Sequence, residues 1–236
     1  ILTQPDNQPY SPSTFFVQGD TITLEDRVAG TLNVYRAGKK VDQFRSPDTC
    51  CSDLLIDSDG HYWILGDEEV DEYVRRPGAK KLTHLSTRPA GDDQPTWLFQ
   101  DGQNIYVKQS EDDMVLVSGM GQVGPGMKTE SLDRSVTATD GDRLNVEIRT
   151  RTVPAGITML SRTPGYYYFL VYEHSKKKWG TVYQLTRAGA VVNTYNMLHA
   201  KDKLPWRDVQ VAADGQVYQM VISNKTTRIY RLPPNP

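Results

Sequence analysis

Short apolar runs separated by glycine-containing turns extend through most of the chain. The clearest example is Asp53–Leu65, with the sequence DLLIDSDGHYWIL, in which the apolar run Leu54–Ile56 and the aromatic run Tyr62–Leu65 flank an Asp-Ser-Asp-Gly turn. Glycine adopts positive φ without steric cost, and aspartate side chains hydrogen-bond to nearby backbone. The pattern therefore predicts two short antiparallel strands joined by a tight turn.

The same pattern recurs along the chain. Thr96–Val107 reads TWLFQDGQNIYV, Asp208–Val221 reads DVQVAADGQVYQMV, and a weaker copy, FFVQGDTITL, lies at Phe15–Leu24. In chain order, the turn glycines of the first three copies are Gly19, Gly60 and Gly102, and they are 41 and 42 residues apart. A period near 40 residues with four short strands in each period is typical of a β-propeller blade. Stacking blades around an axis buries both faces of each sheet and leaves only short edges exposed.

We therefore predict an all-β protein that contains a β-propeller of about five four-stranded antiparallel blades, the last of them incomplete in this chain. A Pro-, Asn- and Gln-rich linker or arm is expected over residues 1–13, and a single propeller domain over residues 14–236. The units are expected at approximately residues 14–47, 50–89, 93–152, 155–200 and 203–236. No segment has a convincing helical pattern.

The third unit departs from the simple repeat. It leads into a Gly- and Pro-rich loop, Gly119–Lys128, and then into an extra hairpin that turns at Gly141. Gly141 lies 39 residues after the preceding turn glycine, as a new blade requires, but the next turn glycine, Gly165, follows after only 24 residues. Residues 119–152 are therefore either an insertion or a shortened blade, and we favour an insertion.

The last unit has three predicted strands rather than four and stops at Pro233. An open ring of blades leaves two bare edges, so we expect a strand from elsewhere to complete this blade. The candidate is Ile1–Thr3 or a segment beyond this chain.

These repeats resemble those of known bacterial propellers. DLLIDSDGHYWIL followed by VDEYVRRPGAKKLTHL resembles the repeats of the NHL, YVTN and regulator-propeller types, and DVQVAADGQVYQMVISNKTTRIYRL is similar in the same way. The resemblance covers most of Phe15–Leu232 and is poorest over residues 119–152. It implies the fold but little about function, because propellers host protein binding, ligand binding and several kinds of catalysis.

Composition restricts the partners. The formal net charge is −2 with a pI of about 6.1, so there is no overall electrostatic reason to expect a nucleic acid partner. No apolar run approaches the roughly 18 residues of a membrane helix, so we expect no membrane insertion within this chain. The first residue is Ile1, and a removed signal peptide, a removed anchor or an arbitrary boundary would each explain it.

Several candidate chemistries are weak. Asp57 and Asp59 suggest a calcium loop, but the third alternating position is His61, and turn formation explains these residues better. The four histidines occupy unrelated strand positions, so we expect no metal, no cofactor and no catalytic residue set. The two cysteines, Cys50 and Cys51, are adjacent, and they are either free thiols or a vicinal disulfide.

The strongest site hypothesis comes from topology, because the loops that lead into the innermost strands of a propeller cluster around its channel on one face. These loops carry aromatic, charged and sulfur groups, which together suit a binding site. The predicted ligand-binding residues are Cys50, Cys51, Asp53, Asp92, Asp93, Trp97, Trp206, Arg207 and Asp208. A vicinal disulfide would add a rigid apolar surface there and would require an oxidising compartment.

The sequence thus favours a non-catalytic binding or scaffold module that recognises a protein or carbohydrate ligand through the blade-entry loops. We expect it to be extracytoplasmic, either secreted or periplasmic. One alternative is a hydrolase or lyase that uses entry-loop carboxylates. Another is the sensor domain of a larger signalling protein.

Overall fold

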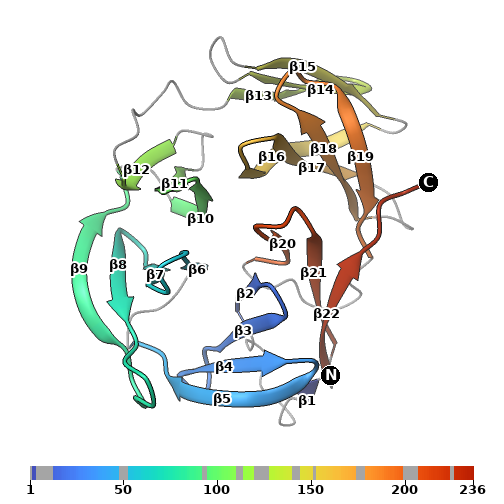
Figure 1. Ribbon diagram of the computed structural model, residues 1–236. Coiled ribbons are helices and arrows are strands. Elements are labelled where there is room, and N and C mark those ends of the chain that lie inside the picture. The colour runs from blue at the N-terminus through green and yellow to red at the C-terminus, as the bar shows by residue number, and fades with distance from the viewer. Residues whose placement is uncertain are drawn as a thin grey trace.

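The computed structural model describes residues 2–3, 13–47, 53–91, 95–109, 114–119, 128–139, 144–150, 153–173, 179–198, 207–223 and 226–236. Their regular structure consists of β-strands, which form small antiparallel sheets arranged around a common centre (Figure 1). The predicted all-β propeller is confirmed. Within these residues, no helix is long and apolar enough to cross a membrane.

The sheets follow chain order and are numbered here as blades. Blade 1 contains β2 (Phe15–Gln18), β3 (Thr21–Asp26), β4 (Thr31–Arg36) and β5 (Lys39–Arg45), and blade 2 contains β6 (Asp53–Ile56), β7 (Tyr62–Leu65), β8 (Glu69–Val74) and β9 (Thr83–Pro89). Blade 3 contains β10 (Pro95–Asp101), β11 (Asn104–Gln109) and β12 (Met114–Ser118). Blade 4 contains β16 (Pro154–Arg162), β17 (Tyr166–Glu173), β18 (Gly180–Thr186) and β19 (Val191–Asn196).

Blade 5 is completed by the beginning of the chain. Its strands β20 (Val209–Val211), β21 (Val217–Ile222) and β22 (Thr226–Leu232) are joined by β1 (Leu2–Thr3), which pairs antiparallel with β22. The register places Leu2 opposite Thr227 and Thr3 opposite Thr226. The prediction that Ile1–Thr3 supplies the missing strand is confirmed for the two residues that form β1.

Five inner strands form a closed ring. β2 contacts β6, β6 contacts β10, β10 contacts β16, β16 contacts β20, and β20 contacts β2 (Figure 1). Each pair of neighbouring blades shares a hydrophobic cluster among the described residues. Between blades 2 and 3, for example, Trp63 and Leu65 pack in one cluster with Leu98 and Val107. The five blades therefore bury their faces against each other around the whole ring.

A sixth sheet lies outside this ring. It contains β13 (Lys128–Ser131), β14 (Ser135–Thr139) and β15 (Asn145–Arg149), and it packs against β16 (Figure 1). Its side chains Val136 and Ile148 share a hydrophobic cluster with Phe99 of blade 3 and Phe169 of blade 4. Since β10 and β16 touch each other directly, this sheet is an insertion that fills the wedge between two blades and does not widen the ring.

The repeated turn is held by an aspartate. Asp57 Oδ1 accepts hydrogen bonds from the backbone N–H groups of Asp59 and His61, both at 2.9 Å, and Oδ2 accepts one from Trp63 Nε1 at 2.8 Å. Gly60 has a φ of +81°, which favours glycine. The turn explanation of these residues agrees with this geometry, because every Asp57 oxygen is used within the hairpin.

Candidate functional site

The face at which β2, β6, β10, β16 and β20 begin is called the entry face here. Four predicted site residues lie at this face among the described residues: Asp53 begins β6, Trp97 lies near the start of β10, and Arg207 and Asp208 precede β20. The other five lie outside the described residues; they are Cys50, Cys51, Asp92, Asp93 and Trp206.

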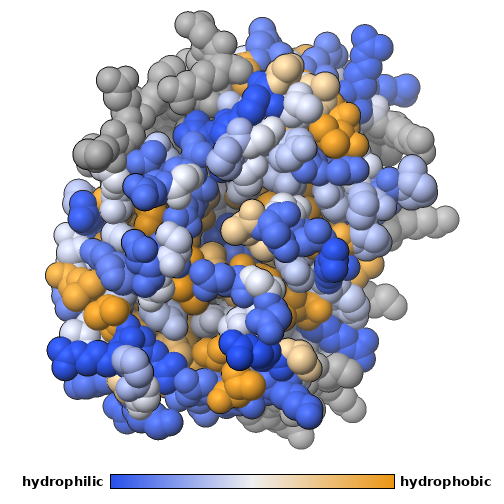
Figure 2. Space-filling view, viewed as in Figure 1, coloured by the Kyte–Doolittle hydropathy of each residue, from blue (hydrophilic) through white to orange (hydrophobic). Residues whose placement is uncertain are grey.

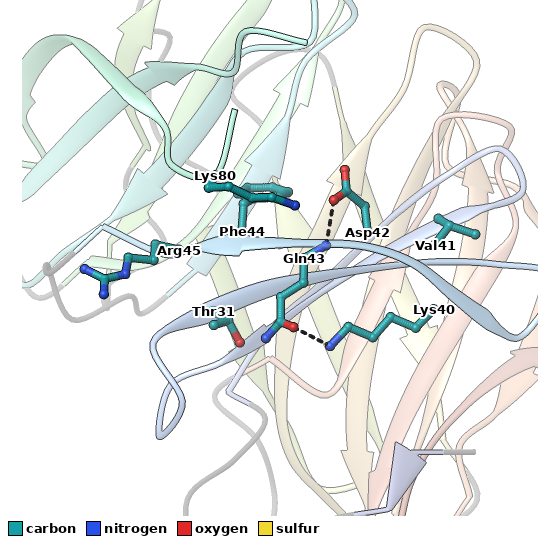
Figure 3. Close-up of a pocket in the computed structure, with 8 residues that line it drawn as sticks. All are labelled: Thr31, Lys40, Val41, Asp42, Gln43, Phe44, Arg45 and Lys80. Atoms are coloured by element: carbon teal, nitrogen blue, oxygen red, sulfur yellow. Dashed lines mark hydrogen bonds between the residues drawn. The ribbon is translucent and has the colours of Figure 1, made fainter. Parts of the chain in front are cut away.

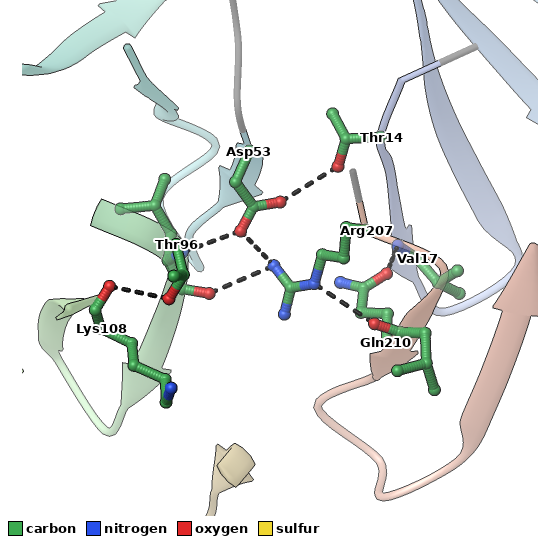
Figure 4. A network of polar contacts seen from close by, with 9 residues as sticks. Thr14, Val17, Asp53, Thr96, Lys108, Arg207 and Gln210 are labelled. Carbon is green, nitrogen blue, oxygen red and sulfur yellow. Dashed lines mark hydrogen bonds and ion pairs between the residues drawn. The ribbon is translucent and has the colours of Figure 1, made fainter. Parts of the chain in front are cut away.

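Asp53 and Arg207 form a buried ion pair between blades 2 and 5 (Figure 4). Arg207 Nη1 donates to Asp53 Oδ2, which also accepts the backbone N–H of Leu98 at 2.8 Å. Asp53 Oδ1 accepts the hydroxyl of Thr14 at 3.0 Å. Asp53 is 0 % exposed and Arg207 is 5 % exposed. The pair and its partners therefore connect β6 and β10 with the segments that precede β2 and β20.

Arg207 makes further bonds to the backbone. Nη1 also donates to the carbonyl of Leu98 at 3.2 Å, and Nε donates to the carbonyl of Val209 at 3.3 Å. Burial raises the pKa of Asp53, while the Arg207 charge and the Leu98 N–H act in the opposite direction. Because both Asp53 oxygens are occupied inside the protein, this residue braces the ring and is not available to a ligand at the surface.

Asp208 directly follows Arg207 in the chain, but the environment of its carboxyl group differs from that of Asp53. Its side chain is 7 % exposed, and the described residues provide no hydrogen-bond partner for Oδ2. Burial raises the pKa of Asp208 to about 6. Its backbone is well anchored, because its carbonyl accepts the N–H of Met220 at 2.7 Å. Asp208 is thus a buried carboxyl group on a fixed backbone, with a hydrogen bond from its own backbone N–H and one oxygen, Oδ2, without a described partner.

Aromatic side chains gather in the same region. Trp97, Tyr172 and Trp179 all pack against the hydrophobic cluster between blades 4 and 5, and the rings of Tyr172 and Trp179 meet edge to face at 6.5 Å. Burial, and to a smaller extent the charge of Asp208, raises the pKa of Tyr172. The buried Trp97 Nε1 has no hydrogen-bond partner among the described residues. These four residues (Trp97, Tyr172, Trp179 and Asp208) are called the aromatic–carboxyl cluster below.

Tyr172 and Trp179 were not among the predicted site residues. They lie at the end of β17 and just before β18, and in a meander the connection between the second and third strands returns to the entry face. From the sequence, Tyr172 was interpreted as strand packing and Trp179 as part of a solvated turn, and the predicted site used only the loops that lead into inner strands. The second set of connections on this face was the signal that would have found both residues.

A central cavity of about 280 Å³ lies inside the ring. Its lining includes Ser58, Gly102 and Pro164, which are in the turns that follow inner strands. At its other end the lining includes Leu98 and Arg207, beside the ion pair. The cavity therefore extends from the entry-face brace toward the opposite face, which is called the hairpin face here. No Asp, Glu or His is among the described residues that line it.

A second hollow is an open groove along the outer strand β5 (Figure 3). Lys40 Nζ donates to Gln43 Oε1 at 2.8 Å, and Asp42 is paired with Arg75 at 2.6 Å. These polar groups bond to each other, so the groove offers no concentrated set of unused groups. In Figure 2 the face in view is largely hydrophilic, with scattered apolar residues. Among the described residues, no three His, Cys, Asp or Glu side chains are grouped so as to hold a metal ion.

Comparisons with known proteins support the fold alone. No family model matches the chain, and no curated protein matches it. Among solved structures, a luciferin-regenerating enzyme has 11 % sequence identity and a TM-score of 0.50, with 95 % of this chain and 92 % of that chain covered. Glutaminyl cyclase from Myxococcus xanthus has 12 % identity and a TM-score of 0.49, with 100 % and 95 % covered. The WD40 β-propeller domain of Doa1 has 11 % identity and a TM-score of 0.47, with 97 % and 81 % covered. At these identities no function is transferred to this chain.

The buried ion pair predicts a large effect on stability. Asp53→Asn leaves the Arg207 charge buried without its counter-charge, so we expect the free energy of unfolding to fall by about 3–5 kcal/mol. Urea unfolding measures this change. The control is Asp20→Asn, which breaks the exposed Arg36–Asp20 pair and should change stability little. Equal effects of the two substitutions would contradict a bracing role for Asp53.

Asp208 predicts a pH dependence of stability. Its pKa is about 6 in the folded protein, against an ordinary value of 3.8, so the folded state favours the protonated form and loses stability as the pH rises from about 4 through 6. Asp208→Asn removes this loss. We expect the stability gained by the substitution to be about 3 kcal/mol larger at pH 7 than near pH 3.5, in paired urea titrations. A gain that is the same at both pH values would show that Asp208 is not an unpaired buried carboxyl group.

Proposed function

We propose that this chain is a non-catalytic binding module that recognises a protein or a glycan through its entry face. The observation that supports this proposal is the aromatic–carboxyl cluster. Within it, Asp208 Oδ2 and Trp97 Nε1 are buried without described hydrogen-bond partners. Asp208 interacts electrostatically with Tyr172, and Trp97 packs against the same hydrophobic cluster as Tyr172 and Trp179.

A buried carboxylate oxygen without a hydrogen-bond partner, such as Asp208 Oδ2, lowers the stability of the folded state. Transferring a polar group out of water without a compensating hydrogen bond destabilises the folded state by about 1–3 kcal/mol, and a charged group costs more. The fold does not depend on the unsatisfied oxygen of Asp208, because the ring is braced by Asp53 and Arg207 and the blades bury their faces against each other. A ligand that donates to Asp208 and accepts from Trp97 would offset the cost when it binds.

Of the two ligand classes, a glycan is better supported. A carboxylate accepts hydrogen bonds from sugar hydroxyl groups, an indole N–H donates to them, and aromatic rings pack against the apolar faces of sugar rings. The aromatic–carboxyl cluster contains all three kinds of group within one region of the entry face.

One observation favours the alternative function of a hydrolase. A carboxyl group with a pKa of about 6 suits a general acid near neutral pH. Glycoside hydrolysis normally needs a second carboxylate to act as base or nucleophile. Asp53, the other predicted entry-face carboxylate that the structure describes, has both oxygens occupied. Binding therefore accounts for the described residues with fewer additional groups.

The binding proposal is tested by screening the chain on a glycan array and measuring the affinity for each hit by titration calorimetry. Trp97→Phe keeps a ring but removes the N–H, and Asp208→Asn removes the charge; each should weaken glycan binding by about tenfold or more. Tyr166→Phe is a control that removes the hydroxyl group of an exposed aromatic side chain at the start of β17, on the hairpin face. Hits whose affinity is the same in all three variants, or an array without hits, would rule out a glycan site here.

We further propose an extracytoplasmic location and a bacterial repeat of the NHL, YVTN or regulator-propeller type, on the sequence resemblance and on the adjacent cysteines. A vicinal disulfide between Cys50 and Cys51 would require an oxidising compartment. We expect the intact mass of protein from its native source to show alkylation of two thiols only after reduction. Alkylation without reductant would remove this support for export.

A further inference from the structure

The central cavity has a floor with unused hydrogen-bond donors. It extends toward the hairpin face, whereas the glycan site proposed above lies on the entry face, so the two proposals stand on different residues and fail independently. Arg207 and Gln210 both line the cavity. Their side chains are deeply buried, since Arg207 is 5 % exposed and Gln210 is 2 % exposed.

Arg207 presents one edge of its guanidinium to the cavity. Nη1 and Nε are bonded to Asp53, Leu98 and Val209, and Nη2 has no hydrogen-bond partner among the described residues. In Figure 4 this second terminal nitrogen points away from Asp53. The ion pair therefore fixes the guanidinium in place while leaving one of its NH₂ groups available.

Gln210 presents a second donor. Its Oε1 accepts the backbone N–H of Val17 at 2.7 Å, which fixes the orientation of the amide. Only the oxygen of a glutamine amide can accept from an N–H group, so the amide nitrogen Nε2 is the atom left over. The described residues provide no hydrogen-bond partner for Nε2. Figure 4 shows the amide oxygen of Gln210 turned toward the backbone N–H of Val17.

The remaining walls define the rest of the ligand. Phe16, Leu55, Leu160 and Val211 contribute apolar surface, Gln100, Ser161, Arg162 and Thr163 contribute polar groups, and no described carboxylate lines the cavity. The volume of about 280 Å³ lies at the lower end of small-molecule sites, which typically run from about 300 to 1,000 Å³. Donors at the floor, walls that are partly apolar, a second arginine and a small volume together favour a small amphipathic anion.

We propose that the central cavity binds a small organic carboxylate from the hairpin face, with one carboxylate oxygen on Arg207 Nη2, the other on Gln210 Nε2, and the apolar part against the channel walls. Charge-assisted bonds from a guanidinium to a carboxylate are stronger than bonds between neutral groups. The site therefore prefers the anion over a neutral ligand of the same shape.

The first test is calorimetric titration of the chain with benzoate and with butyrate, and with their neutral counterparts benzamide and butyramide. We expect at least one of the carboxylates to bind saturably with one site per chain, and its amide to bind at least tenfold more weakly. Equal affinity for acid and amide, or no binding of either carboxylate, would overturn the proposal.

Variants locate the binding. Gln210→Glu keeps an oxygen for the Val17 N–H and replaces the Nε2 donor with an anionic oxygen that can pair with Arg207 Nη2, so we expect at least a tenfold loss of carboxylate affinity. Arg207→Lys keeps a cation near Asp53 but removes the free NH₂ group and should also weaken binding. The matched control, Gln103→Glu, adds the same charge at an exposed turn of the hairpin face and should leave affinity unchanged.

Thermal unfolding of each variant checks that the fold is retained. A folded Gln210→Glu variant with unchanged carboxylate affinity would overturn the assignment of the floor. Glycan binding at the entry face should be unaffected by Gln210→Glu, so loss of one activity without the other distinguishes the two proposals.

Discussion

The ion pair between Asp53 and Arg207 is the interaction on which the ring depends most. It lies at the centre, where the inner strands come closest, and it joins two residues that are 154 positions apart in the sequence. Its hydrogen bonds extend to Leu98 and Thr14, so one buried carboxylate fixes the position of three further chain segments. Hydrophobic packing between blades is strong but not directional, whereas this network specifies how the blades meet at the axis.

Arg207 and Asp208 are adjacent in the chain, but they have different roles in the ring of blades. Arg207 is bonded on two sides and adds rigidity, whereas Asp208 is held by its backbone and carries a carboxylate oxygen, Oδ2, that lacks a described partner. A site of this kind needs a rigid support, because a mobile carboxyl group would move into water or toward another donor. The brace thus fixes the segment that carries the unsatisfied oxygen of Asp208.

The repeat could be predicted from sequence because each blade is a local pattern. The apolar runs and the glycine turns such as that at Gly60 recur with a period near 40 residues, and the three-stranded last unit indicated that Ile1–Thr3 or a segment beyond this chain completes it. The pairing of Asp53 with Arg207 could not be derived in the same way, since it depends on which blades become neighbours after closure. Tyr172 and Trp179 were missed because their place on the entry face follows from the direction of β17 and β18. The insertion was recognised only by its broken spacing; its packing against β16 is a tertiary contact with no signal in the local pattern.

The pairing of β1 with β22 has a consequence for the order of folding. β1 precedes blades 1 to 4 in the chain, but it completes a sheet whose other strands follow them. During translation β1 therefore remains unpaired while blades 1 to 4 form. The contacts in these blades are mostly within one blade or between adjacent blades. The pairing of β1 with β22 joins the strands that are farthest apart in this sequence. The entropy cost of closing the loop between them is therefore offset only when the other strands of blade 5 have formed. We expect the ring to remain open, with two unprotected sheet edges, until the strands of blade 5 have left the ribosome.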